Sequence, residues 1–217
     1  AQLEAYDGNA ARPVLCLLLA SSVVNDGRAK AGFTAPSAAA QARAVARSTR
    51  RAGVTASDLD VLELHATATK LGDAIEVAGV ARALGDRDPS KALKLTSLKG
   101  NIGHANCAAG LTGLVKAALM LGHDYAPPVC HFKTLNPKVA ALPPGAVVVA
   151  PGAPLRGCSC AGVSSFGVGG TNAHATLRAV AVSACGRGGY GVYRKRTKER
   201  PSPRARIEDA DVAVPAA

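Results

Sequence analysis

A histidine ends a short apolar segment of this chain, and two threonines follow it at alternating positions. His65 ends the segment 60–65, a predicted buried strand, and Thr67 and Thr69 follow at alternating positions. A histidine at the end of a strand can point its imidazole into a cleft, where it can donate or accept a proton. Taken alone, the same segment could equally hold a hydrogen-bonded core histidine.

Lys99 and His104 lie in a second segment, residues 99–104 (KGNIGH), directly before an apolar stretch. Its two glycines allow a tight turn that would bring the Lys99 ammonium close to the His104 imidazole. A neighbouring ammonium disfavours the imidazolium, so His104 would stay neutral and able to donate a hydrogen bond. The alternative is a plain strand-to-helix turn with a surface lysine.

A third segment, residues 162–174, is rich in glycine and contains Phe166, Gly167, Val168 and Gly169. Its glycines let the backbone adopt conformations closed to other residues and present N–H groups to a ligand. It is not a nucleotide-binding loop, because no Gly-Lys-Ser/Thr sequence follows and no dinucleotide fingerprint is built on it. A hairpin turn is the alternative interpretation.

Strands and helices are predicted to alternate, which would place these three segments at the ends of elements. The predicted strands are 14–24, 60–65 and 92–98, and the predicted helices are 36–52, 73–84 and 105–121, the last ending at Gly122. Three further strands are predicted at 146–149, 158–164 and 172–177. This β-α-β-α-β-α order followed by a small β meander predicts an α/β layered domain.

Composition narrows the classes of protein to consider. With 217 residues, 48% hydrophobic and 3% aromatic, the chain suits one domain of packed helices and sheet. No apolar run reaches the roughly 20 residues that a membrane span needs. The six cysteines lack paired C-x-x-C spacing, so neither a disulfide framework nor a metal site is expected.

The net charge of +11 is concentrated near the C-terminus. Eight Lys or Arg residues and one Glu lie between Arg187 and Arg206, a local charge of +7. Residues 183–217 are therefore predicted to be a basic, disordered tail, residues 1–13 a partial N-terminal segment, and residues 14–182 the folded region. No aromatic RNA-binding motif accompanies the basic run, so nucleic acid is not the expected partner. A binding protein whose tail docks on nucleic acid or on an acidic carrier protein is a remote alternative.

Together, and in this order, the three segments resemble the motifs of β-ketoacyl synthases, in particular the ketosynthase domains of modular type I polyketide synthases. Residues 22–28 and 33–36 resemble the strand and loop before the first histidine of that family, and residues 127–137 the stretch between its second and third motifs. The similarity runs from about Pro13 to Leu177. It implies the C-terminal half of a thiolase-like αβα fold.

The resemblance also implies a reaction and its partners. Such enzymes perform a decarboxylative Claisen condensation of an acyl-thioester with a malonyl-type extender. His65 and His104 would donate hydrogen bonds to the extender's thioester carbonyl, and Lys99 would orient His104. No cofactor or metal would be bound by the chain itself, because the phosphopantetheine arm belongs to the partner acyl carrier protein. The full-length domain is expected to be a homodimer.

Substrate-facing residues are implied in two of the segments. The N–H of Val168 would form one arm of an oxyanion hole, in a turn shared with Phe166, Gly167 and Gly169. Thr67 and Thr69 would face the pantetheine arm.

This sequence departs from the family at several positions. The nucleophilic cysteine of the family lies well before the first histidine, in a region that is not in this sequence, and Cys107 is on the wrong element to replace it. Ala66 and Ala68 stand where glycines are usual, and Val168 where an aromatic residue is common.

These departures lead us to expect no condensation by this chain alone. The alternative is a non-condensing relative, such as a decarboxylase or chain-length partner, or a pseudo-enzyme. The apolar faces of residues 111–121 and of the first strand would lack their cover, so we expect poor solubility or reliance on a partner chain.

Overall fold

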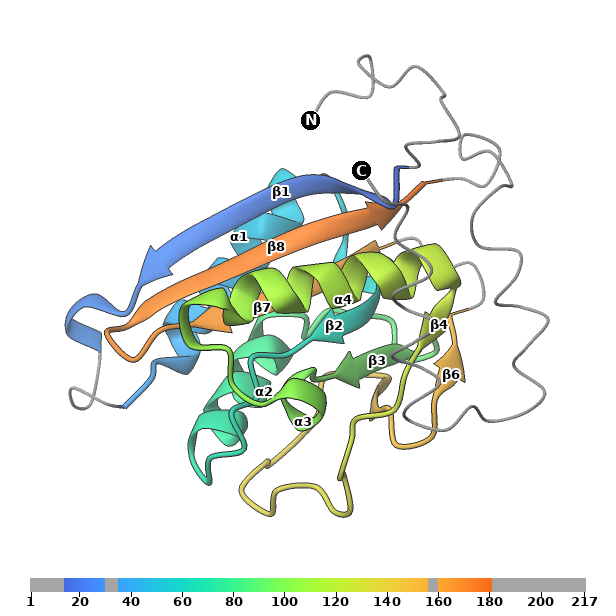
Figure 1. Ribbon diagram of the computed structural model, residues 1–217. Helices are drawn as coiled ribbons and strands as arrows, with labels where there is room; N and C mark the ends of the chain where they lie inside the picture. Colours follow the sequence, from blue (N-terminus) through green and yellow to red (C-terminus); the bar gives the residue numbers. More distant parts are fainter. Residues whose placement is uncertain (1–13, 30–34, 156–159, 181–217) are drawn as a thin grey trace. The chain divides into compact units, whose positions relative to one another are not determined.

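A six-stranded mixed sheet organises the part of the chain that the computed structural model describes, residues 14–29, 35–155 and 160–180. Its strand order is β1-β8-β7-β2-β3-β5 (Figure 1). The predicted N-terminal segment, the basic tail, Cys158 and Cys185 lie outside the described residues.

The elements have the following bounds. The strands of the large sheet are β1 (Cys16–Asn25), β2 (Leu59–Glu63), β3 (Leu93–Thr96), β5 (Ala146–Val148), β7 (Cys160–Phe166) and β8 (Thr171–Ala179). Two short strands, β4 (Tyr125–Ala126) and β6 (Ala153–Pro154), form a second sheet. The α-helices are α1 (Ala38–Arg51), α2 (Gly72–Ala83), α3 (Lys99–Ile102) and α4 (Ala109–His123), and the 3-10 helices are η2 (Gly27–Ala29), η3 (Ala56–Asp58) and η4 (Asn106–Ala108).

The predicted α/β layered class is confirmed, but the last strands do not form a separate meander. β2 pairs in parallel with both β3 and β7, and β5 pairs in parallel with β3 at the edge. β8 returns antiparallel to β7, and β1 pairs antiparallel with β8. The first five residues of β7 are buried, so this strand needs neighbours on both edges and helices over both faces, and it lies inside the main sheet.

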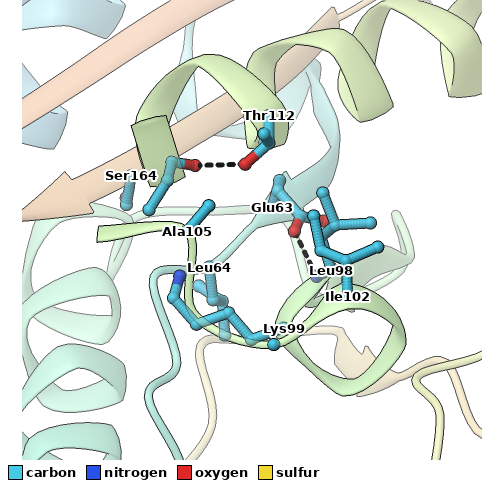
Figure 2. Close-up of a pocket in the computed structure, with 11 residues that line it drawn as sticks. Glu63, Leu64, Leu98, Lys99, Ile102, Ala105, Thr112 and Ser164 are labelled. Carbon is cyan, nitrogen blue, oxygen red and sulfur yellow. Dashed lines mark hydrogen bonds between the residues drawn. The ribbon is translucent and has the colours of Figure 1, made fainter. Parts of the chain in front are cut away.

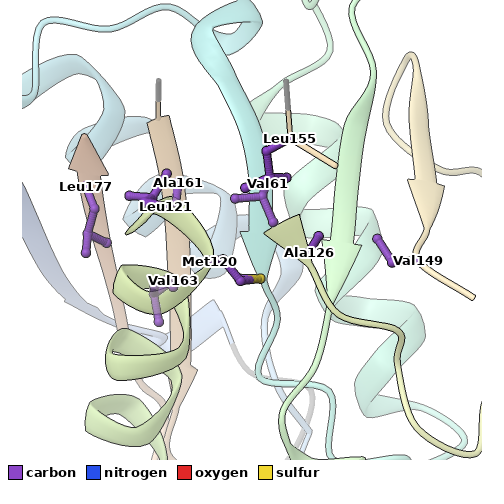
Figure 3. Close-up of a cluster of buried hydrophobic side chains, with 10 residues drawn as sticks. Val61, Met120, Leu121, Ala126, Val149, Leu155, Ala161, Val163 and Leu177 are labelled. Carbon is purple, nitrogen blue, oxygen red and sulfur yellow. The ribbon is translucent and has the colours of Figure 1, made fainter. Parts of the chain in front are cut away.

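Helices on opposite faces of the sheet complete the layers, with α4 on one face and α1 and α2 on the other (Figure 1). Figure 3 shows the cluster on the α4 face, which contains Val61, Ala161, Val163, Met120 and Leu121. The cluster on the other face contains Val45, Leu62, Val80, Leu93 and Leu95. Burial of each large aliphatic side chain contributes about 1.5–3 kcal/mol, so the two clusters stabilise the sheet from both faces.

The predicted helix 105–121 differs from the observed α4 at both ends. It begins at Ala109, because Asn106 adopts a positive φ angle of 49° that interrupts a helix, and residues 106–108 form the 3-10 helix η4. It continues through Gly122 to His123, and Asp124 takes the left-handed conformation that ends it. None of the helices in the described ranges has the length and apolar character that a membrane crossing requires.

The outward face of α4 is apolar. Leu111, Val115 and Leu119 are 69%, 56% and 41% exposed, and Val23 of β1 is 63% exposed. A surface helix ordinarily turns polar side chains outward. These side chains are exposed within the described part of the chain, and the expected poor solubility or reliance on a partner chain stays a prediction.

Candidate functional site

The sheet topology brings the three sequence segments together at the carboxyl ends of its parallel strands. β2, β3 and β7 run parallel, with β2 between the other two, so their carboxyl ends meet. His65 lies two residues beyond β2, Lys99 three residues beyond β3, and Phe166 ends β7. His65 thus becomes a neighbour of Lys99 and of Phe166, which lie 34 and 101 positions further along the chain.

The two histidines predicted to be catalytic lie side by side. The ring centroids of His65 and His104 are 5.4 Å apart, with the ring planes at 82° in an edge-to-face arrangement. The Phe166 ring lies 5.8 Å from the His65 ring. His65 is partly buried and His104 is exposed. One small substrate group can therefore reach both imidazoles.

Lys99 contacts His65, not His104 as the sequence predicted. Its Nζ lies 3.4 Å from Nδ1 of His65, whereas the sequence predicted that it would orient His104. The reason is that residues 99–102 form the helical turn α3 next to the end of β2, so the lysine reaches across to the neighbouring strand end. An ammonium can only donate a hydrogen bond, so Nδ1 of His65 accepts and Nε2 carries the ring proton.

The His104 ring is held in the same tautomer by a different donor. The backbone N–H of Asn106 donates to His104 Nδ1 at 3.1 Å. The left-handed conformation of Asn106, with φ 49°, turns this N–H back toward the ring. In its neutral form His104 therefore carries its proton on Nε2, as His65 does. The site presents two imidazole N–H donors.

Electrostatics keep His65 uncharged. Burial, together with the proximity of Lys99 and His104, lowers the pKa of His65 from 6.5 to about 4. Burial also lowers the pKa of Lys99, against the opposing influence of nearby carboxylates. At neutral pH His65 is a hydrogen-bond donor rather than a cation.

Sequence analysis missed Glu76, which holds the chain as it leaves β2. Its Oε1 accepts from the His65 N–H at 2.7 Å, and its Oε2 accepts from the Ala66 N–H at 2.8 Å. Burial raises the pKa of Glu76 to about 7, although these two hydrogen bonds oppose the rise. A carboxylate in an otherwise apolar stretch of the predicted helix 73–84 was the signal that could have identified it.

The two threonines have different surroundings. Thr67 is half-buried, and Thr69 is exposed. Thr69 Oγ1 accepts from the Gly72 N–H at 3.1 Å at the start of α2. Ala66 precedes Thr67, and Ala68 lies between the two threonines. These alanines have positive φ angles of 28° and 59°. The two alanines thus occupy backbone conformations that favour glycine.

Replacing Ala68 by glycine is expected to raise the free energy of unfolding by about 0.5–1 kcal/mol. The left-handed conformation costs a non-glycine residue roughly 1–2 kcal/mol, and the added freedom of the unfolded chain offsets about half of the gain. The matched control is Ala46→Gly, since Ala46 is an exposed alanine in the interior of α1 with ordinary helical geometry; this change should lower stability by about 0.5–1 kcal/mol. Urea denaturation of both variants measures the difference, and a loss of stability in both would contradict the strain argument.

The glycine-rich segment is a hairpin turn between β7 and β8 that reaches the site edge. The Gly167 N–H donates to Thr171 O at 2.7 Å, and Gly170 has a φ of 93°. Val168 is 70% exposed at the tip. The hairpin interpretation is therefore correct, and it leaves the oxyanion role of Val168 as a proposal.

Asp26 and Asn172, which sequence analysis also missed as functional residues, anchor this turn to the end of β1. The Asn172 side-chain amide donates to Asp26 Oδ1 at 2.7 Å, and the Asp26 N–H donates to Gly170 O at 2.8 Å. These two hydrogen bonds hold the turn against the end of β1.

None of the four cysteines within the described ranges forms a disulfide. Cys16 and Cys160 begin β1 and β7, at the edge of the sheet opposite the histidines. Cys130 accepts a hydrogen bond from the Asn101 side chain at 2.9 Å, and Cys107 is exposed in η4. In the same part of the chain no cluster of three His, Cys, Asp or Glu side chains is arranged to hold a metal ion.

Comparison with known proteins bears on this arrangement. The family model described as "Beta-ketoacyl synthase, C-terminal domain" matches residues 15–133. The chain is 45% identical over 172 residues to erythronolide synthase EryA3 of Saccharopolyspora erythraea, covering 75% of this chain and 5% of that protein. It is 41% identical over 176 residues to mycoketide-CoA synthase of Mycobacterium tuberculosis, covering 78% of this chain and 4% of that protein.

Solved structures agree with the sequence matches. The oxazolomycin ketosynthase domain OzmH KS7 of Streptomyces albus superposes with a TM-score of 0.73 at 34% identity, covering 79% of this chain and 31% of that one. The ketosynthase from module 6 of the Bacillus subtilis bacillaene synthase gives a TM-score of 0.72 at 29% identity, covering 77% and 31%. The chain thus spans about a third of those ketosynthases and a small part of the curated relatives.

Proposed function

Because the chain belongs to the beta-ketoacyl synthase family through its C-terminal domain, a family of acyltransferases, we propose that it supplies the two-histidine part of a decarboxylative condensation. The substrate would be a malonyl-type thioester carried on the phosphopantetheine arm of an acyl carrier protein. The observation that carries the proposal is the pair of adjacent imidazoles, 5.4 Å apart, each accepting at Nδ1 and thus able to donate from Nε2.

These donors stabilise the charge that develops during decarboxylation. When the bond between the malonyl α-carbon and the carboxylate breaks, CO₂ leaves. The two electrons of that bond stay on the α-carbon and form an enolate. The negative charge moves to the thioester oxygen, where His65 and His104 donate hydrogen bonds. Each donor placed where charge develops is typically worth about 10²–10³ in rate. Lys99 supports this role by holding His65 neutral and in the required tautomer.

Carbon–carbon bond formation needs a further group. The enolate carbon would attack an acyl group held on a cysteine thiolate, and the thiolate would leave. Cys16 and Cys160 begin strands that run toward the site, and Cys107 and Cys130 follow His104 in the chain, whereas the nucleophile of the family precedes the first histidine. We therefore propose that this nucleophile comes from a part of the fold outside these 217 residues. The Val168 N–H would then donate to the tetrahedral oxyanion, and Thr67 would face the pantetheine arm.

A non-condensing decarboxylase is the second candidate. It is favoured by one observation, that the two imidazole donors already lie together within the described residues. Decarboxylation needs only the two imidazole donors, whereas condensation needs the acyl-cysteine as well. The basic-tail binding hypothesis concerns residues outside the described ranges.

The proposal is tested by incubating the chain with malonyl-pantetheine and following CO₂ and acetyl-pantetheine. We expect CO₂ release above that of buffer and of heat-denatured chain, without a new carbon–carbon bond when an acyl-thioester is added. Release of CO₂ at the buffer rate would contradict the proposed role of the histidines. Formation of a β-ketoacyl product by this chain alone would instead contradict the assignment of the nucleophile to a region outside it.

A further inference from the structure

A buried ion pair lies beneath the histidine site. Glu63 Oε2 is 2.8 Å from Lys116 Nζ, and the two side chains are only 3% and 8% exposed. Glu63 is the last residue of β2, two positions before His65, and Lys116 lies in α4, which follows His104. The pair therefore joins the segments that carry the two histidines.

The Glu63 carboxylate also holds the segment that carries Lys99. Its Oε1 accepts from the backbone N–H of Leu98, the residue directly before Lys99. Its Oε2 accepts from Thr96 Oγ1 at 2.6 Å, at the end of β3. Figure 2 shows the Glu63–Leu98 hydrogen bond at a shallow pocket that Lys99 and Thr112 also line. One carboxylate thus contacts β3, the segment after it and α4.

The chain is shaped to let α4 approach this carboxylate. Gly113 lies on α4 one turn before Lys116, and a Cβ at position 113 would come within 3.3 Å of both Glu63 Cγ and Val163 Cγ1. That distance is tighter than ordinary van der Waals contact, so a larger residue would require the Glu63 and Val163 side chains to shift by a few tenths of an ångström. The close contact brings Lys116 within reach of Glu63.

Stability alone does not account for the pair. Desolvation of two buried charges largely cancels their attraction, and apolar residues of similar volume often hold a core equally well. An apolar pair could not, however, accept the directed hydrogen bonds from Leu98 and Thr96. The four-residue helix α3 is too short to sustain itself, so its position depends on such external contacts.

We propose that Glu63 and Lys116 are positioning residues that set Lys99, and through it His65, for the reaction. The proposal rests on the function proposed above, because it explains how that site is held together. Neither side chain touches the substrate. Glu63 fixes the start of α3 through Leu98, and this places the Lys99 ammonium 3.4 Å from His65 Nδ1.

Two uncharged double variants test the proposal. E63M/K116M removes the ion pair and the acceptor for Leu98, whereas E63Q/K116M removes the charges but retains an amide oxygen that can accept from Leu98. The control is Ser48→Ala, which deletes another buried hydrogen bond, 2.8 Å long, between Ser48 and Thr176 on the α1 side of the sheet. Circular dichroism and urea denaturation establish that each variant is folded.

The decisive readout is the pKa of His65, followed by NMR titration of the 217-residue chain. Lys99 and His104 face this imidazole, and Glu76 holds its backbone. In E63M/K116M the ammonium loses its place, so the pKa of His65 should rise by about one unit from its low value. E63Q/K116M and the Ser48 variant should retain the low pKa. An unchanged pKa in E63M/K116M, or an equal rise in all three variants, would overturn the proposal.

Decarboxylation kinetics separate this inference from the proposed function. E63M/K116M should lower kcat for malonyl-pantetheine about tenfold with KM unchanged, because only the transition state depends on the alignment of His65, and E63Q/K116M should recover most of it. If the unaltered chain releases no CO₂ but the His65 titration shifts as expected, the proposed function fails while the positioning role stands. If CO₂ release is normal in E63M/K116M and the pKa is unmoved, only the positioning role fails.

Discussion

Replacing His65 by alanine is expected to lower the rate of malonyl-thioester decarboxylation by about 10²–10³-fold, and His104→Ala should have an effect of the same size. Each change deletes one of the two Nε2 donors that stabilise the enolate oxygen. The loss should appear in kcat more than in KM, because the carbonyl oxygen gains most of its charge in the transition state. Steady-state release of CO₂ from malonyl-pantetheine measures both constants.

His123→Ala is the matched control, since His123 ends α4, at the opposite end of this helix from His104. It should leave the rate unchanged. The double variant H65A/H104A should be impaired by less than the product of the single effects, because residues that act as a unit are not additive. Equal losses in all three single variants would indicate a general effect on folding and contradict the assigned roles.

The free energy of unfolding is expected to fall by roughly 3 kcal/mol between pH 7 and pH 4 on account of His174 alone. Burial lowers the pKa of His174 from 6.5 to about 4. Between these two values the unfolded chain binds a proton at this histidine and the folded chain does not, so stability rises with pH. The loss on acidification begins near pH 6.5 and is complete near pH 4.

His174→Asn isolates this contribution. An asparagine amide lies near the position of Nδ1 and can retain the 3.0 Å hydrogen bond with Ser164, but it does not titrate. Denaturation curves at pH 7 and about pH 5 should show a smaller loss for the variant than for the unaltered chain. His65 contributes in the same direction, and Glu76, with a pKa raised to about 7, in the opposite direction. Both are present in the two proteins and cancel in the comparison, so parallel pH profiles would contradict the prediction.

Local patterns in the sequence were enough to predict the order of strands and helices and to identify the two histidines as candidate site residues. Apolar periodicity predicted β1, β2, β3, α1 and α2 close to their observed bounds, because each buries one face or both and this leaves a mark on the residue pattern. His65 and His104 were identified for the same reason, since each stands where an apolar element begins or ends. The need for glycine at positions 66 and 68 was visible only through the family resemblance.

Tertiary structure alone decided which side chains meet. The parallel pairing of β2 with β3 and β7 brings Lys99 to His65 rather than to His104, which is nearer in sequence. No local pattern encodes the order of strands in a sheet. Glu76 and the Glu63–Lys116 pair likewise acquire their roles from partners 10 or more residues away. Charged residues within apolar elements are ordinarily solvated, and here only packing shows that they are buried, partnered and able to hold the site.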